Sequence, residues 1–268
     1  MVEPILRWAG SKKKLLPILE QATPKTFSRY IEPFVGSAVN FLRLSPKRAL
    51  LADLNSDLMG TYLAVRNHPR AVWNRVAAMS KEPEFYYSLR AIDASTLNAL
   101  DRAARFIYLN RFCFNGVYRT NRQGFFNVPR GSGDLYVPEY RVFLNFSRSL
   151  QATELWCGDF ESIVSKARKE DFLYLDPPYA LGTKRDRGEY GSGSFKDIDE
   201  SRLAGVLEMA ASRGAKVLLS YSPSPFLLHR LKGWNVHPIA VNRSVAGFAS
   251  SRRMAQEVLM SNYSWTAR

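Results

Sequence analysis

The residues best suited to chemistry in this sequence form the turn Asp176-Pro177-Pro178-Tyr179. They follow the apolar run 172–175, which predicts a buried strand, and the two prolines cannot continue a hydrogen-bonded ladder. A carboxylate and an aromatic ring are therefore expected at the carboxyl end of a strand. In open α/β sheets, this edge is where ligands bind.

Such a turn is suited to methylation of an amino group on a nucleobase. The lone pair of this amine is delocalised into the ring, so acceptors must draw its two N–H bonds out of the ring plane. The carboxylate of Asp176 and the carbonyl of Pro177 are candidate acceptors. Tyr179 can stack on the base, which contributes about 1–3 kcal/mol in other nucleic-acid sites. The alternative is a turn that ends a strand beside an incidental acid and aromatic residue.

Two earlier segments have the form of a cofactor site. In the first, Ser11 is predicted to cap a helix that runs to about Gln21, and the free amides of such a helix start attract anions. Lys12 would add a positive charge there and Trp8 a flat apolar wall. The alternative for this segment is a capped basic helix on the surface.

In the second segment, the predicted strand 30–32 leads through a small-residue turn into a helix, which is the element order of a nucleotide cradle. Asp53 ends the next predicted strand, at the ~20-residue interval at which an acid binds the ribose hydroxyls in such folds. Alternatively, Asp53 caps the following helix. Asp159 and Phe160 follow a later strand and are placed to contact an adenine ring, unless Asp159 only caps the next helix.

The segment 114–124 is dense in donors that read base edges. Within it, Asn115-Gly116 predicts a hairpin. Arg119 can bind guanine through two hydrogen bonds, which gives about 1–3 kcal/mol of discrimination against a wrong base. Asn121 and Arg122 are neighbours that can reach bases or phosphates. The alternative is a solvated basic hairpin without a reading function.

The chain has 268 residues, with 38 Lys and Arg against 24 Asp and Glu, a formal net charge of +14. This excess predicts a polyanionic partner such as nucleic acid, or alternatively a basic surface without specificity. Cys113 and Cys157 form neither a zinc pattern nor a disulfide framework, so we expect both to be reduced core residues. The sequence has neither a membrane-spanning stretch nor a signal-peptide pattern, which predicts a cytoplasmic protein.

Four motifs, in their order along the chain, resemble those of the Dam-type (D12 class) DNA adenine-N6 methyltransferases. They are Trp8-Ala9-Gly10, Glu32-Pro33-Phe34-Val35-Gly36, Asp53-Leu54-Asn55 and Asp176-Pro177-Pro178-Tyr179. The resemblance covers nearly the whole chain, because it extends through 108–111, 115–119 and 126–129 to Arg243, Arg252 and Arg253.

The resemblance implies an α/β fold: a Rossmann-like sheet of an S-adenosylmethionine-dependent methyltransferase with a mostly helical DNA-recognition insert. Residues 1–55 and 144–268 would form the catalytic methyltransferase domain, and residues 56–143 the target-recognition domain. The enzyme would transfer a methyl group from S-adenosylmethionine to N6 of a flipped adenine in double-stranded DNA, within GATC or a related short site. No metal is implied.

The candidate residues fall into three sets. The catalytic set is Asp176, Pro177 and Tyr179. The cofactor-binding set is Trp8, Lys12, Phe34, Gly36, Asp53, Asp159, Phe160 and Asp176. The DNA-binding set is Arg7, Phe114, Asn115, Val117, Arg119, Asn121 and Arg122, and Arg243, Arg252 and Arg253 are further candidates for phosphate contacts.

Two residues depart from the family pattern. Ser11 and Ala38 stand where the family usually has glycine, and because both are small we expect altered cofactor affinity rather than a lost site. The glycine-rich stretch 182–194 is either a loop that orders over the flipped base or an ordinary surface loop.

Two other functions stay open. An enzyme of the same fold could methylate cytosine N4 or RNA, although the acid that begins the turn argues against this. The chain could also be a DNA-binding homologue that has lost catalysis, which the intact turn opposes.

Overall fold

The computed structural model describes residues 2–121, 123–133, 135–178, 195, 197–242 and 254–266. Several predictions lie outside these residues. They are the roles of Tyr179 and Arg122, the loop 182–194, and the phosphate contacts of Arg243, Arg252 and Arg253.

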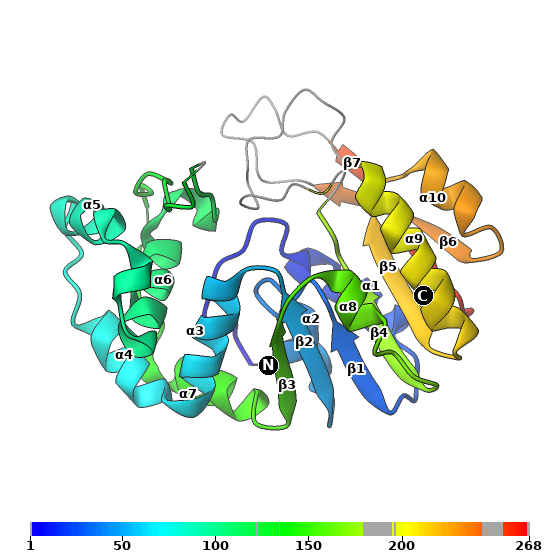
Figure 1. Cartoon of the computed structure of the whole chain (residues 1–268), viewed down its shortest axis with the longest axis horizontal. Coiled ribbons are helices and arrows are strands. Elements are labelled where there is room, and N and C mark those ends of the chain that lie inside the picture. The colour runs from blue at the N-terminus through cyan, green and yellow to red at the C-terminus, as the bar shows by residue number, and fades with distance from the viewer. Residues whose placement is uncertain are drawn as a thin grey trace.

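Within the described part of the chain, seven strands form one sheet in the order β3-β2-β1-β4-β5-β7-β6 (Figure 1). Strands β1 to β5 run parallel to one another, whereas β7 pairs antiparallel with β5 and with β6. This confirms the predicted Rossmann-like sheet. The strands are β1 (Arg29–Glu32), β2 (Ala49–Asp53), β3 (Thr153–Cys157), β4 (Asp171–Leu175), β5 (Lys216–Tyr221), β6 (Asn235–Asn242) and β7 (Met254–Ser261).

The strand order reverses between β1 and β4, which are hydrogen-bonded neighbours. In open α/β sheets, ligands bind in the crevice outside the carboxyl ends of the strands at such a reversal. The turn that begins at Asp176 and the turn that begins at Pro33 follow these two strands. The topology therefore brings the predicted catalytic turn and the predicted cofactor loop to the same edge.

Two buried clusters cover the two faces of the sheet, because successive side chains of a strand point to opposite faces. In β1, Tyr30 belongs to the first cluster and Ile31 to the second. The first cluster includes side chains of α1 (Leu16–Ala22) and α2 (Val39–Leu44). The second contains side chains of α8 (Phe160–Val164), α9 (Asp197–Ser212) and α10 (Pro225–Arg230).

A helical part lies beside the β3 end of the sheet, on the left of Figure 1. Its core is continuous with the first cluster, and the rings of Tyr62 and Phe146 pack 5.0 Å apart. Apolar residues at helical spacing predict helices at 71–78, 84–92 and 97–111, and the structure confirms all three to within two residues at each end. The helices are α3 (Ser56–Asn67), α4 (Pro69–Ala77), α5 (Pro83–Ala91), α6 (Ala99–Phe112) and α7 (Tyr140–Ser149), joined by short 3₁₀ turns at Ala94–Thr96 and Phe114–Gly116.

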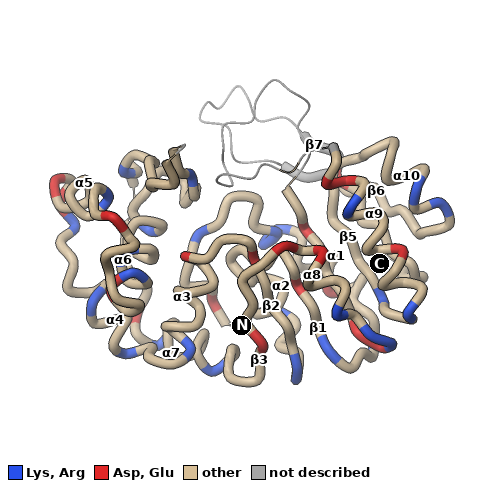
Figure 2. The backbone as a smooth tube through the Cα atoms, in the orientation of Figure 1, with Lys and Arg blue, Asp and Glu red and all other residues tan. Residues whose placement is uncertain are grey.

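The division into a catalytic and a recognition domain remains a prediction. Helix α7 spans the expected boundary at residue 143. Lys and Arg occur both in the helical part and around the sheet (Figure 2). The described residues include no helix that is long and apolar enough to cross a membrane.

The predicted cap at Ser11 is wrong. A 3₁₀ turn at Lys12–Leu15 precedes α1, and the Ser11 side chain makes no capping hydrogen bond. Instead, the Ser11 hydroxyl accepts a hydrogen bond from the Ser37 hydroxyl at 3.4 Å. The α-helix begins next to Pro17, which suits a first turn because its missing N–H would be unpaired there in any case.

The predicted hairpin at Asn115-Gly116 is also displaced. These residues have left-handed backbone angles, with φ of 53° and 65°, within a 3₁₀ turn. A Cβ on Gly116 would lie 2.4 Å from the Cβ of Arg7, so this turn permits a close approach of the N-terminal segment. The chain reverses later, where the Asn121 amide donates to the Phe125 carbonyl at 2.8 Å.

The prediction for the cysteines holds only in part. Cys113 is buried and Cys157 is exposed, and both are free thiols. Cys157 is exposed because it ends β3, which is an edge strand of the sheet.

Candidate active site

The carboxylate of Asp176 directly follows β4, at the reversal of strand order, and contacts a buried ammonium group. Lys12 Nζ lies 2.9 Å from Asp176 Oδ1 and 3.5 Å from Glu257 Oε2. Lys12 is 8% exposed and Glu257 3% exposed. The ammonium of Lys12 therefore contacts two carboxylates, one at the end of β4 and one on β7.

Glu257 is not among the site residues that the sequence predicts. The available signal was an acid at the start of the apolar run Val258 to Met260. On β7 it shares a side of the sheet with Leu259, which belongs to the first cluster, because side chains two residues apart point the same way. An acid at an inward position of a strand is a candidate for a buried ion pair.

A second buried acid, Glu32, ends β1 and is 3% exposed. Burial raises the pKa of its carboxyl well above the ordinary value, and the charge of Asp176 raises it further, against the opposing effect of a hydrogen bond with Tyr30. Its Oε2 atom is buried without a hydrogen-bond partner among the described residues. The neutral form of Glu32 is therefore favoured beside the site.

Gly36 and Asp53 form the predicted cofactor loop together. Asp53 Oδ2 accepts a hydrogen bond from the Gly36 amide at 3.2 Å, and Oδ1 accepts one from the Asn55 amide at 3.0 Å. Asn55, and not Asp53, caps α3 by accepting from the Leu58 amide at 3.0 Å. The capping alternative for Asp53 is therefore wrong. Ala38, one of the departures from the family pattern, has a left-handed φ of 59°.

Trp8 lines this loop and also contacts the helical part. A Cβ on Gly36 would lie 2.7 Å from Cδ1 of Trp8, so the indole lies directly against the loop backbone. The indole also stacks on Tyr118, with ring centroids 6.0 Å apart and planes 16° apart. The Tyr118 hydroxyl donates to Asp57 Oδ2 at 3.3 Å. Trp8 is therefore positioned by both parts of the molecule.

Phe34 and Phe160 are brought together with a third aromatic residue that sequence reasoning did not single out, Phe195. The ring of Phe34 lies 5.4 Å from that of Phe160, and the ring of Phe195 lies 5.9 Å from that of Phe160. Phe160 and Phe195 belong to the second buried cluster, and Phe34 packs against it, so these rings are packed on one another.

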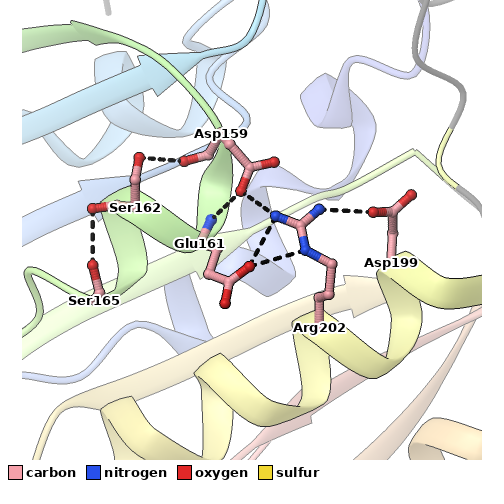
Figure 3. A network of polar contacts seen from close by, with 6 residues as sticks. All are labelled: Asp159, Glu161, Ser162, Ser165, Asp199 and Arg202. Carbon is pink, nitrogen blue, oxygen red and sulfur yellow. Dashed lines mark hydrogen bonds and ion pairs between the residues drawn. The ribbon is translucent and has the colours of Figure 1, made fainter.

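Asp159 caps α8, as the alternative for this residue predicted, by accepting from the Glu161 amide at 3.0 Å. It also belongs to an ionic network around Arg202 of α9 (Figure 3). Arg202 donates to Asp159 at 2.6 Å, to Glu161 at 2.9 Å and to Asp199 at 2.8 Å. Its guanidinium carbon lies 4.9 Å from the ring centre of Phe160. Cofactor binding by Asp159 remains a prediction.

The predicted DNA-binding residues that the structure describes lie around the end of α6. Arg119 Nε donates to Asn127 Oδ1 at 2.8 Å, and Phe114 is 43% exposed. The side-chain oxygen of Asn121 accepts from two amides of its own turn, those of Gln123 and Phe125, each at 3.0 Å. In the described part of the chain, no group of three or more His, Cys, Asp or Glu residues could hold a metal ion.

We expect Gly36→Ala to lower the free energy of unfolding by about 1–3 kcal/mol, because a new methyl group would overpack the site against the Trp8 ring. The φ of 44° at Gly36 adds backbone strain for any residue with a Cβ. The matched control is Gly60→Ala in α3, where a Cβ would meet nothing within 4 Å. Because Gly is unfavourable inside a helix, the control should gain about 0.5–1 kcal/mol in urea denaturation. Equal effects of the two substitutions would contradict the close approach of Trp8.

Burial raises the pKa of the Asp53 carboxyl to about 6, against its hydrogen bonds from backbone amides. The pKa of Asp53 is about 4 in the unfolded chain, so the folded state holds its proton more tightly. This difference stabilises the fold fully below about pH 4, and the stabilisation is lost as the pH rises through about 6. The unfolding free energy of the wild type relative to Asp53→Asn should therefore fall between pH 4 and 6 and level off above. Glu208→Gln, which removes an exposed carboxylate, controls for the loss of a charge. If the difference in unfolding free energy between the wild type and Asp53→Asn did not change with pH, the raised pKa would be refuted.

Comparisons with known proteins identify the family of this chain. The family described as "D12 class N6 adenine-specific DNA methyltransferase" matches residues 8–245. The chain is 31% identical to the Type II methyltransferase M1.LlaDCHI of Lactococcus lactis subsp. cremoris, covering 98% of this chain and 96% of that protein. It is 33% identical to the Type II methyltransferase M.MjaIII of Methanocaldococcus jannaschii, covering 98% and 99%. It is 31% identical to a DNA adenine methylase of Vibrio cholerae serotype O1, covering 95% and 94%. The chain belongs to the D12 class of N6 adenine-specific DNA methyltransferases.

Proposed function

We propose that this enzyme transfers a methyl group from S-adenosylmethionine to N6 of an adenine that is flipped out of double-stranded DNA, within GATC or a related short site. The observation that carries the proposal is the position of Asp176 outside the carboxyl end of β4, where the strand order reverses. Its Oδ1 atom already accepts an N–H donor, the ammonium of Lys12, at 2.9 Å. This supports Asp176 as an acceptor for the amino group of the base.

The residues around the adjacent loop fit S-adenosylmethionine. A Cβ on Gly36 would fill the space against Trp8, and the Asp53 carboxylate is fixed by two backbone amides. Asp53 would bind the ribose hydroxyls, Trp8 and Gly36 would line the loop, and the rings of Phe34 and Phe160 would contact the base. When bound, the cofactor supplies an electrophilic methyl group on a positively charged sulfur.

The chain's own groups would orient the amine. The Asp176 carboxylate and the Pro177 carbonyl would accept the two N–H bonds of adenine N6, which draws them out of the ring plane and frees the lone pair. The lone pair of N6 would form the new N–C bond, and the electrons of the broken C–S bond would stay with the leaving thioether. The amine then carries a positive charge and loses a proton, so the scheme requires no general base before attack.

Extrusion of the base costs a few kcal/mol of lost stacking, which contacts to the groove and the phosphates must offset. The residues around the end of α6 are candidates for these contacts, and the exposed ring of Phe114 could help to open the duplex. The alternative acceptors, cytosine N4 and RNA, are disfavoured by the match to an adenine-specific family.

The reaction is tested by expressing the protein in a host that lacks adenine methylation and mapping modified bases by single-molecule sequencing. We expect N6-methyladenine within one short motif. Asp176→Ala should lose at least about 100-fold in methylation, since it removes an electrostatic contact at the reacting amine, while DNA binding is retained. Asp101→Ala, which removes a surface carboxylate of α6, is the matched control. Near-normal turnover of Asp176→Ala, or methylation of another base, would overturn the proposal.

The role of Arg119 is tested on a panel of duplexes that differ at one base pair. Arg119→Ala should cost about 1–3 kcal/mol on the cognate sequence and relax the preference at one position. Asn127→Ala should relax the same position more weakly, because Asn127 holds the Nε atom of Arg119 at 2.8 Å. An equal loss on every sequence would instead identify Arg119 as a phosphate contact.

A further inference from the structure

Glu257 is a buried carboxylate that the proposed reaction does not use. It is 3% exposed, and its Oε2 lies 3.5 Å from the Lys12 ammonium. A buried ion costs several kcal/mol in lost hydration unless its partners compensate. A strand that only packs against the core would be served as well by an apolar residue at this position. The charge of Glu257 therefore calls for an electrostatic explanation.

The charges of the three residues give that explanation. Lys12 contributes one positive charge, and Asp176 and Glu257 contribute one negative charge each, so these three described residues together sum to −1. Without Glu257, the ammonium of Lys12 would offset the charge of Asp176. Glu32, the neighbouring acid, adds little charge because burial favours its neutral form through a raised pKa.

We propose that Glu257 is a specificity-determining residue that makes this site prefer the positively charged methyl donor over its neutral thioether product. The inference rests on the proposed function: Asp176 holds the amine that receives the methyl group, so the sulfur that carries this methyl group would lie near the same carboxylate. A negative net charge attracts the sulfonium and has no comparable effect on the thioether. The two molecules share all their other contacts, so Glu257 acts on the ratio of their affinities. A consequence is easier release of the product after each turnover.

The size of the effect follows from the distance over which the charge acts. At an effective dielectric constant near 20, two unit charges roughly 12 Å apart interact strongly enough to change an affinity about tenfold, and a shorter separation gives a larger change. Lys12 also faces both carboxylates, so removal of its charge should change the ratio in the opposite direction.

The test is calorimetry of the full chain with S-adenosylmethionine and with S-adenosylhomocysteine. Glu257→Gln keeps the shape and removes the charge, and should lower the preference for the donor about tenfold, with little change in affinity for the product. Lys12→Gln should raise the preference, and the double variant, with its net charge restored to −1, should return towards the wild type. Glu208→Gln breaks an exposed ion pair with Arg230 and should leave the ratio unchanged.

The ratio is measured within one preparation, so an unfolded fraction of a variant cancels. If Glu257→Gln lost affinity for both ligands equally, Glu257 would have a structural role and the inference would be overturned. If Glu257→Gln does not fold, an unchanged ratio in Lys12→Gln would overturn it. Wild-type protein that binds neither ligand would instead overturn the proposed cofactor, and this inference with it.

Discussion

The buried ammonium of Lys12 constrains the architecture of the site. A buried charge is tolerated only with close partners, and here the partners are the carboxylates of Asp176 and Glu257, at 2.9 and 3.5 Å. These three residues come from the N-terminal segment, the end of β4 and the antiparallel strand β7. The ion pairs therefore hold together three segments that are far apart in the chain, at the edge where open α/β sheets bind their ligands.

The same N-terminal segment reaches the helical part. Asn110 of α6 forms two hydrogen bonds with the backbone of Arg7, at 2.8 and 2.7 Å, and Arg111 Nε donates to the Ile5 carbonyl at 2.7 Å. Trp8 lies between the loop at Gly36 and the ring of Tyr118. A single short stretch thus contacts the predicted cofactor loop, the carboxylate proposed as catalytic and the segment expected to bind DNA.

Local sequence patterns predicted most of the secondary structure and the edge at which the site lies. The runs that became β1, β2, β4 and β5 are apolar and bounded by turns, and their type depends on side-chain periodicity within a few residues. The placement of Asp53 and Asp176 at strand ends followed from the same patterns. Helices α7 and α10 were not predicted, and helix ends shifted by a few residues, because ends depend on capping contacts.

What the sequence alone determined is therefore the order of the elements, the family and the candidate residues within short motifs, since each depends on neighbours along the chain. Tertiary structure decided the rest. Gly116 approaches Arg7, the Ser11 hydroxyl meets Ser37, and Glu257 meets Lys12. Each of these contacts joins residues far apart in sequence, so no local pattern contains it. The charge of the site also depends on such a contact, because the carboxylate of Glu257 forms an ion pair only when folding places the Lys12 ammonium beside it.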